Sequence, residues 1–184
     1  MDKFYHIDRT NRLEVGQTIE LIKFNDIEWD NKSKPDFLQK IVSNMFPNGV
    51  SCHGNQYFLS GSLFNDTSSE IELIFELVRR EKYSDKLSRF ESFFGVDKDT
   101  LIPMTYRLNS NLNICKVYEV EAEEYSKHDM TLLRKGSNLV SIALAELYWS
   151  GDSINNPLYE YLLKPPIKII REVSLDEILV NKEQ

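Results

Sequence analysis

A single glutamate stands in an unusually apolar stretch near the end of the chain. Glu160 lies between Tyr159 and Tyr161, in an aromatic and aliphatic run that predicts a short strand. A pair of prolines interrupts this run, and residues 167–173 predict the next strand. A carboxylate in such surroundings needs a charged partner or an opening to solvent. Glu160 is therefore either half of a structural ion pair or a group at the edge of a pocket.

Both interpretations of Glu160 have support in the sequence. Three cations follow it closely, namely Lys164, Lys168 and Arg171. Structural ion-pair networks imitate functional carboxylates, so a pair with one of these cations is one interpretation. In the other interpretation, the carboxylate stabilises positive charge that develops during a reaction.

Length and composition limit the protein class. The chain has 184 residues, of which 41% are hydrophobic, and this is enough for one domain with a sizeable core. Its net charge of −7 argues against a general binder of polyanions. The sequence contains neither a signal peptide nor an apolar run of the ~18 residues that a membrane helix needs. With two cysteines far apart, we expect a reduced, cytoplasmic protein that does not associate with membranes.

Hydrophobic periodicity predicts interleaved strands and helices. The expected strands lie at residues 4–9, 17–24 and 113–122, around Glu160, and at 167–173. Three main helices are expected, over residues 33–46, 69–82 and 137–150, followed by a short last helix after Ser174. Ser69 and Glu72 have the spacing of a capping box. Residues 50–64 predict a loop with a short strand, and 123–136 form a polar stretch. The order lacks a regular βαβ rhythm, so we predict an α+β fold.

Several kinds of chemistry lack the residues they need. The three histidines and two cysteines share no ligand spacing, so we expect no metal. The chain has no Walker motif and no Gly-x-Gly-x-x-Gly turn for a nucleotide. It also has no Gly-x-Ser-x-Gly elbow for acyl transfer.

Three separated stretches, residues 4–9, 88–93 and 159–166, together resemble the ADP-ribosyltransferase superfamily. In order, they carry a first strand with His6, an aromatic stretch with serines, and a late glutamate. The context Glu-x-Leu-aliphatic-Pro-Pro is similar to residues 160–166, with Lys164 as one extra residue. Small bacterial domains of this superfamily also share a Ser-Arg-x-x-Ser stretch and an Ala-x-x-Tyr-Trp-Ser-Gly helix end. The chain resembles them over nearly its whole length.

The resemblance implies a fold, an activity and a substrate. The fold would be one domain over residues 1–184, with mixed or antiparallel strands in two packed small sheets and three main helices. The activity would be transfer of ADP-ribose from NAD to a macromolecular acceptor, either a protein or a nucleic acid. A toxin or effector of this kind would have an antitoxin or immunity protein as a further partner. NAD cleavage passes through an oxocarbenium-like transition state, which a carboxylate stabilises.

The resemblance also assigns roles to particular residues. Glu160 would be the catalytic carboxylate. The ribose or diphosphate of NAD would be bound by His6, Arg9 and Arg89. The nicotinamide ring would be contacted by Tyr5, Phe90 or Phe93. The middle-motif position would be occupied by Ser88 or Ser92.

Two departures from the family pattern leave alternatives open. Leu158 stands where members that modify arginine carry a second acid, which argues against an arginine acceptor. Ser92 stands where one subclass has a tyrosine, so the subclass is open. A non-catalytic module of the same fold that binds a nucleotide or a protein is the alternative function. An unrelated α+β domain is the third hypothesis, and it predicts that His6 and Glu160 share no cleft.

Overall fold

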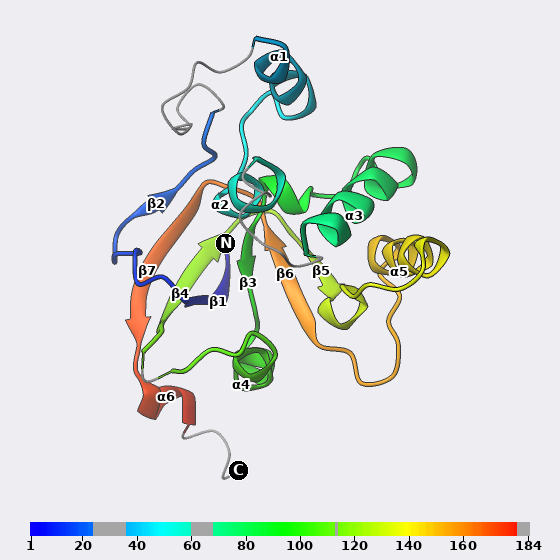
Figure 1. Cartoon of the computed structure of the whole chain (residues 1–184). Coiled ribbons are helices and arrows are strands. Elements are labelled where there is room, and N and C mark those ends of the chain that lie inside the picture. Colours follow the sequence, from blue (N-terminus) through cyan, green and yellow to red (C-terminus); the bar gives the residue numbers. More distant parts are fainter. Residues whose placement is uncertain (24–35, 60–67, 113, 180–184) are drawn as a thin grey trace.

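Two small antiparallel sheets form the centre of the fold (Figure 1). The structure is a computed structural model that describes residues 1–23, 36–59, 68–112 and 114–179. The first sheet contains, in spatial order, β1 (Asp2–Asp8), β4 (Lys116–Ala122), β7 (Ile167–Val173) and β2 (Thr18–Ile19). The second contains β3 (Phe93–Gly95), β6 (Tyr159–Leu163) and β5 (Tyr125–Asp129). The predicted α+β class with two small sheets is confirmed.

The two sheets meet where β1 approaches β3. Tyr5 and Val96 exchange two backbone hydrogen bonds of 2.9 Å, which place the strands side by side. The chain passes from β6 in the second sheet to β7 in the first through a cis bond between Pro165 and Pro166. The three stretches singled out in the sequence therefore lie on or next to the neighbouring strands β1, β3 and β6.

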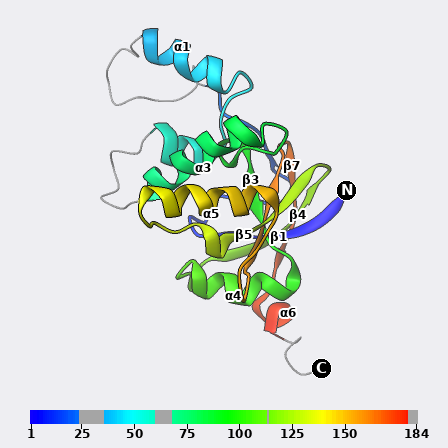
Figure 2. The ribbon, with the colours of Figure 1, turned by 90° about the vertical axis from the view of Figure 1, so that its right-hand side faces the viewer.

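Helices surround this pair of sheets. They are α1 (Asp36–Met45), α2 (Cys52–Gly54), the π-helix η2 (Asn55–Leu59), α3 (Ser68–Lys82), the 3-10 helix η4 (Arg89–Glu91), α4 (Lys98–Arg107), the 3-10 helix η5 (Met130–Leu132), α5 (Asn138–Ser150) and α6 (Leu175–Leu179). Helices α3 and α5 lie side by side next to β5 and β6 (Figures 1 and 2). The indole Nε1 of Trp149 in α5 donates to the carbonyl of Phe75 in α3 at 2.7 Å, which fixes the two helices together. None of the described helices has the length and apolar content needed to cross a membrane.

Strand β6 contributes to two separate cores. Leu162 is fully buried among Phe75, Leu144 and Trp149 beneath α3 and α5. Its neighbour Leu163 is fully buried in the core that the two sheets share. Because successive side chains of a strand point to opposite faces, Glu160 lies on the same face as Leu162 and points toward the helices.

Most of the predicted elements are confirmed by the structure. Periodicity located β1, α1, α3, β4, α5, β6, β7 and α6, although the predicted start at residues 33–35 lies outside the described residues. Ser137 caps α5 as expected, because its Oγ accepts from the backbone N–H of Val140. Gly151 ends α5 with a φ of 86°, a left-handed conformation that favours glycine.

Five predictions were wrong or incomplete. The strand predicted at 17–24 shortens to β2, and the loop predicted at 50–64 contains α2 and η2; residues 24 and 60–64 lie outside the described residues. The polar stretch at 123–136 contains β5, where His128 faces inward and is hydrogen-bonded to the Tyr148 carbonyl. Helix α4, a fourth main helix, was not predicted; it contains Pro103 and is capped by Asp97. Helix α3 begins at Ser68, so Ser69 lies inside it and the predicted capping box is wrong.

Truncating Leu162 tests the core beneath α3 and α5. Replacing a buried leucine with alanine costs about 2–5 kcal/mol, because the removed atoms leave a cavity. We therefore expect Leu162→Ala to lower the free energy of unfolding by this amount, measured by urea denaturation. Ile114, which is 67% exposed, provides the control. A loss in Leu162→Ala no larger than in Ile114→Ala would contradict the assignment of Leu162 to this core.

Candidate functional site

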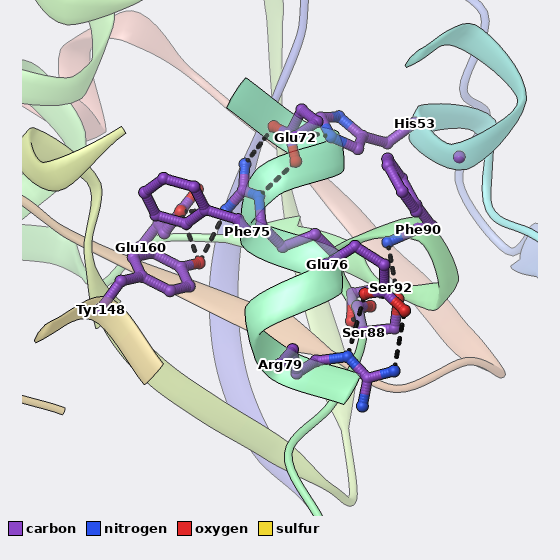
Figure 3. Close-up of polar contacts among 12 residues, drawn as sticks. His53, Glu72, Phe75, Glu76, Arg79, Ser88, Phe90, Ser92, Tyr148 and Glu160 are labelled. Carbon is purple, nitrogen blue, oxygen red and sulfur yellow. Dashed lines mark hydrogen bonds and ion pairs between the residues drawn. The ribbon is translucent and has the colours of Figure 1, made fainter. Parts of the chain in front are cut away.

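The carboxylate of Glu160 is buried and has two partners on one of its oxygens. Its residue is only 4% exposed. Its Oε1 accepts a hydrogen bond from the Tyr148 hydroxyl at 2.9 Å and forms an ion pair with Nη1 of Arg89 (Figure 3). The predicted structural partners of Glu160 were wrong in identity, because Lys164 pairs with Glu124 and Arg171 pairs with Glu119 and Glu177.

Arg89 joins Glu160 to a second buried carboxylate. Its Nε and Nη2 donate to the two oxygens of Glu72 at 2.8 and 2.9 Å, which is a bidentate pair. Its Nη1 also donates to the Tyr148 hydroxyl at 2.6 Å. The guanidinium lies 4.9 Å from the ring centre of Phe94. Arg89 is thus held by residues from α3, α5, β3 and β6.

His53 completes the group on the outer side of Glu72. Its Nε2 lies 3.0 Å from Oε1 of Glu72, an ion-pair distance whose alignment does not meet hydrogen-bond geometry. The His53 side chain is 19% exposed, whereas those of Glu72, Arg89 and Glu160 are between 5% and 8% exposed. We call His53, Glu72, Arg89, Tyr148 and Glu160 the Arg89 cluster. Of the four members whose side-chain exposure is given above, His53 is the most exposed to solvent.

Charge and burial compete in the Arg89 cluster. Burial alone would raise the pKa of Glu72, but the charges of Arg89 and His53 outweigh it and hold that pKa far below its usual value of 4.5. Burial would likewise lower the pKa of Arg89, yet the charges of Glu160 and Glu72 raise it well above its usual value. Burial and the Glu160 carboxylate raise the pKa of Tyr148. The cluster therefore contains two carboxylates around one permanent cation, with Tyr148 neutral.

His128 supports Tyr148 from behind. The imidazole stacks on the Tyr148 ring, with ring centres 4.4 Å apart and planes at 15°. Its Nδ1 must carry the hydrogen, because it bonds the Tyr148 carbonyl at 2.8 Å and a carbonyl only accepts. Burial lowers the pKa of His128 to about 4, so the ring is neutral at physiological pH. A neutral, fixed imidazole positions the tyrosine that contacts Glu160.

A second carboxylate cluster lies one turn further along α3. Glu76, which is 1% exposed, accepts hydrogen bonds from Arg79 at 2.8 and 2.9 Å and from Arg80 at 2.6 Å. Ser88 donates to the same carboxylate at 2.8 Å (Figure 3). Its Oγ also accepts from the backbone N–H of Phe90, which caps η4. Ser88 therefore positions the turn that carries Arg89.

The other predicted site residues lie apart from Glu160. Ser92 is buried and donates to the carbonyl of Ser88 at 2.7 Å. Tyr5 lines a small cavity near α4 and α6. Arg9 is exposed just beyond the end of β1. None of these three has a contact with Glu160 among the interactions of the described residues.

His6 lies on the opposite face of the second sheet from Glu160. Its ring packs on Phe93, with ring centres 4.1 Å apart, and its Nδ1 donates to the Phe94 carbonyl at 2.8 Å. Phe93 and Phe94 are successive residues of β3 and point to opposite faces, and Arg89 lies on the Phe94 side. Burial lowers the pKa of His6, so its ring is neutral. The structure brings Glu160 and Arg89 together but does not bring His6 to them.

Sequence reasoning missed four members of this region. Glu72 was interpreted as a capping residue, His53 and His128 were considered only as metal ligands, and Tyr148 was placed on a helix without a role. Tyr148 does belong to the Ala-x-x-Tyr-Trp-Ser-Gly helix end, and this motif was the signal in the sequence that could have identified it as a site residue. The described residues contain no group of three or more histidine, cysteine, aspartate or glutamate side chains arranged to hold a metal.

Comparison with known proteins gives one result. A family model described as "Protein of unknown function (DUF2441)" matches residues 4–178. No curated protein sequence matches the chain.

Removing the central cation tests the Arg89 cluster. Arg89→Met leaves two buried carboxylates without their partner, and breaking a buried pair in this way costs about 3–5 kcal/mol. We expect the free energy of unfolding at neutral pH to fall by that amount in urea denaturation. Lys164→Met is the matched control, because it breaks an exposed pair with Glu124 that should be worth at most about 1 kcal/mol. Equal losses in the two variants would contradict the buried cluster.

Comparison of the wild type with Arg89→Met also gives a prediction for the pH dependence of stability. The folded-state pKa of Glu72 is depressed, so its contribution to stability is fully present above 4.5 and is lost as the pH falls below that value. In acid the Glu72 carboxylate takes up a proton and no longer needs the cation. The stability difference between wild type and Arg89→Met should therefore be largest at neutral pH and shrink in acid. A difference that stays constant down to strongly acidic pH would contradict this assignment.

Proposed function

The chain belongs to the DUF2441 family, whose description states no function. We propose that the protein is an NAD-dependent ADP-ribosyltransferase that acts on a protein or a nucleic acid, and we argue this from its own residues. The observation that carries the proposal is the contact between Glu160 and Arg89. Both residues were implied by the resemblance, and they are 71 positions apart in the sequence. The stretches that carry His6, Arg89 and Glu160 also lie on or beside neighbouring strands.

The proposed chemistry assigns Glu160 to the reacting sugar. The bond between nicotinamide and C1′ of the ribose breaks, and its electron pair leaves with nicotinamide. The Glu160 carboxylate stabilises the positive charge that develops on the ribose. A nucleophile of the acceptor then attacks C1′ and loses its proton.

Arg89 and Tyr148 position Glu160 in this proposal. The resemblance implied that Arg89 binds phosphate, but its donors already contact Glu72, Tyr148 and Glu160. Its role here is to hold the carboxylate in one orientation, which lowers the cost of reaching the transition state. Because Glu160 is only 4% exposed, NAD requires the packing around the cluster to open. We place the entry at His53, the cluster's most exposed measured member.

A second candidate function is a non-catalytic module that binds a nucleotide or a protein. Two observations favour it. Oε1 of Glu160 already has two internal partners, and His6 lies on the opposite face of the second sheet. Such a module would keep the cluster as a structural device and would release no nicotinamide.

Nicotinamide release from NAD tests the first function, with Glu160→Gln as the variant. Glu119→Gln is the matched control, because Glu119 is also a buried carboxylate paired with arginine but lies in β4, outside the Arg89 cluster. If Glu160 is catalytic, we expect its variant to lose at least about 100-fold in rate, since removing a group that stabilises developing charge has an effect of this size. The control should keep the wild-type rate at a temperature where both variants are folded.

Transfer of label from NAD to a cell lysate is the accompanying measurement. Label that appears with wild type and disappears with Glu160→Gln supports transfer to a macromolecular acceptor. NAD binding by calorimetry without nicotinamide release would support the binding module and contradict catalysis. Equal rates in wild type and Glu160→Gln would also contradict a catalytic Glu160.

A further inference from the structure

The outward side of helices α3 and α5 carries a group of large apolar side chains. On α3, Leu73 and Leu77 are 42% and 53% exposed. On α5, Leu139 and Ile142 are 77% and 42% exposed. The two helices form the right-hand side of the fold in Figure 1 and face the viewer in Figure 2. We call these four side chains the α3–α5 face.

Helix α5 is apolar on its outward side as well as on its inward side. Leu144, Tyr148 and Trp149 are buried beneath it, while Leu139 and Ile142 point away from that core. A surface helix normally has charged and polar residues opposite its buried face, and a helix that is apolar all round is normally covered on both sides. Grouped apolar side chains on a surface also mark interaction sites. The outward side of α5 therefore has the character of an interface.

Charged pairs stand at both ends of the α3–α5 face. At one end, Lys135 pairs with Glu70 at 2.8 Å, just before α5 and in the first turn of α3. At the other end, Lys82 in the last turn of α3 pairs with Glu146 in α5. The ion-paired residues therefore run acid, apolar, base along α3, where exposed Glu81 stands beside Lys82, and base, apolar, acid along the α5 side.

We propose that the α3–α5 face binds a second copy of this chain in a symmetric dimer. The two-fold axis lies in the plane of the face and is perpendicular to α3 and α5. Each helix then packs antiparallel on the same helix of the second copy, so that its start lies over the end of its counterpart. Glu70 then faces the second copy's Lys82, and Lys135 faces the second copy's Glu146. Each of these four charged residues meets one of opposite sign, and the four apolar side chains meet the apolar side chains of the second copy, as a self-complementary two-fold interface requires.

The same charge order disfavours other occupants. A surface of uniform charge, such as an anionic membrane or a nucleic acid, would meet two carboxylates as well as two ammonium groups at this face. Repulsion from the carboxylates would then offset attraction to the lysines. A second copy carries the alternating order that fits, and this choice does not depend on the proposed enzymatic function.

The molar mass in solution tests the dimer. We expect sedimentation equilibrium of the full chain at micromolar concentration to give twice the monomer mass. Leu77→Lys and Leu139→Glu each place a charge in the centre of the apolar contact, so each should weaken dimerisation by at least tenfold. Tyr106→Glu is the matched control, because Tyr106 is a large side chain that is 78% exposed on α4, outside the face. Circular dichroism should show that all four proteins are folded.

Three results would overturn the proposal. One is a wild-type monomer throughout the micromolar range. Another is a dimer that persists in both Leu77→Lys and Leu139→Glu, which would place the interface elsewhere. The third is a monomer that binds vesicles or another protein through Leu77 and Leu139, which would assign the face to a different occupant. Loss of the dimer in these two variants, with Tyr106→Glu still dimeric, would support it.

Discussion

The placement of Arg89 between Glu72 and Glu160 is the constraint on which the surrounding structure depends. A guanidinium and two carboxylates are costly to remove from water unless each finds its partner. Arg89 finds both, and its remaining donor reaches Tyr148. To satisfy these contacts, α3, η4, α5 and β6 must hold fixed positions relative to one another. The cluster therefore selects one arrangement of elements where apolar packing alone would tolerate several.

The elements that could be predicted are those with a strong local signal. Helices α3 and α5 repeat apolar residues at helical spacing, and in β4 and β7 apolar residues are interspersed with charged ones. The missed elements depend on distant contacts. Strand β5 is polar, but Ser126 and His128 are hydrogen-bonded to each other and His128 to the Tyr148 carbonyl. Helix α2 packs so closely on η4 that a Cβ at Gly54 would lie 2.2 Å from the carbonyl oxygen of Phe90.

The candidate site was predictable in part for the same reason. A lone carboxylate in an apolar strand signals a buried partner or a pocket, and that signal is local to Glu160. The identity of the partner is not local, because Arg89 lies 71 positions away and three nearer cations were available. The sequence also could not predict on which face of the sheet each side chain lies. Phe93 and Phe94 differ by one position in β3, and that single step separates the surroundings of His6 from those of Glu160.

A cluster that stabilises a fold can also prepare a carboxylate for chemistry, since both roles require a fixed orientation. In the Arg89 cluster the structural role and the proposed catalytic role conflict only because the substrate must reach Glu160. The contacts that hold Glu160 also exclude solvent, so a ligand must displace part of the packing without separating Glu160 from Arg89. Displacing His53 would leave Glu72 its bidentate pair with Arg89 and would give up the packing of the imidazole on Tyr57 and Phe94. The outer side of Glu72, where the most exposed measured member of the cluster lies, is therefore the side on which the proposed entry of NAD is placed, rather than the inter-sheet core around His6.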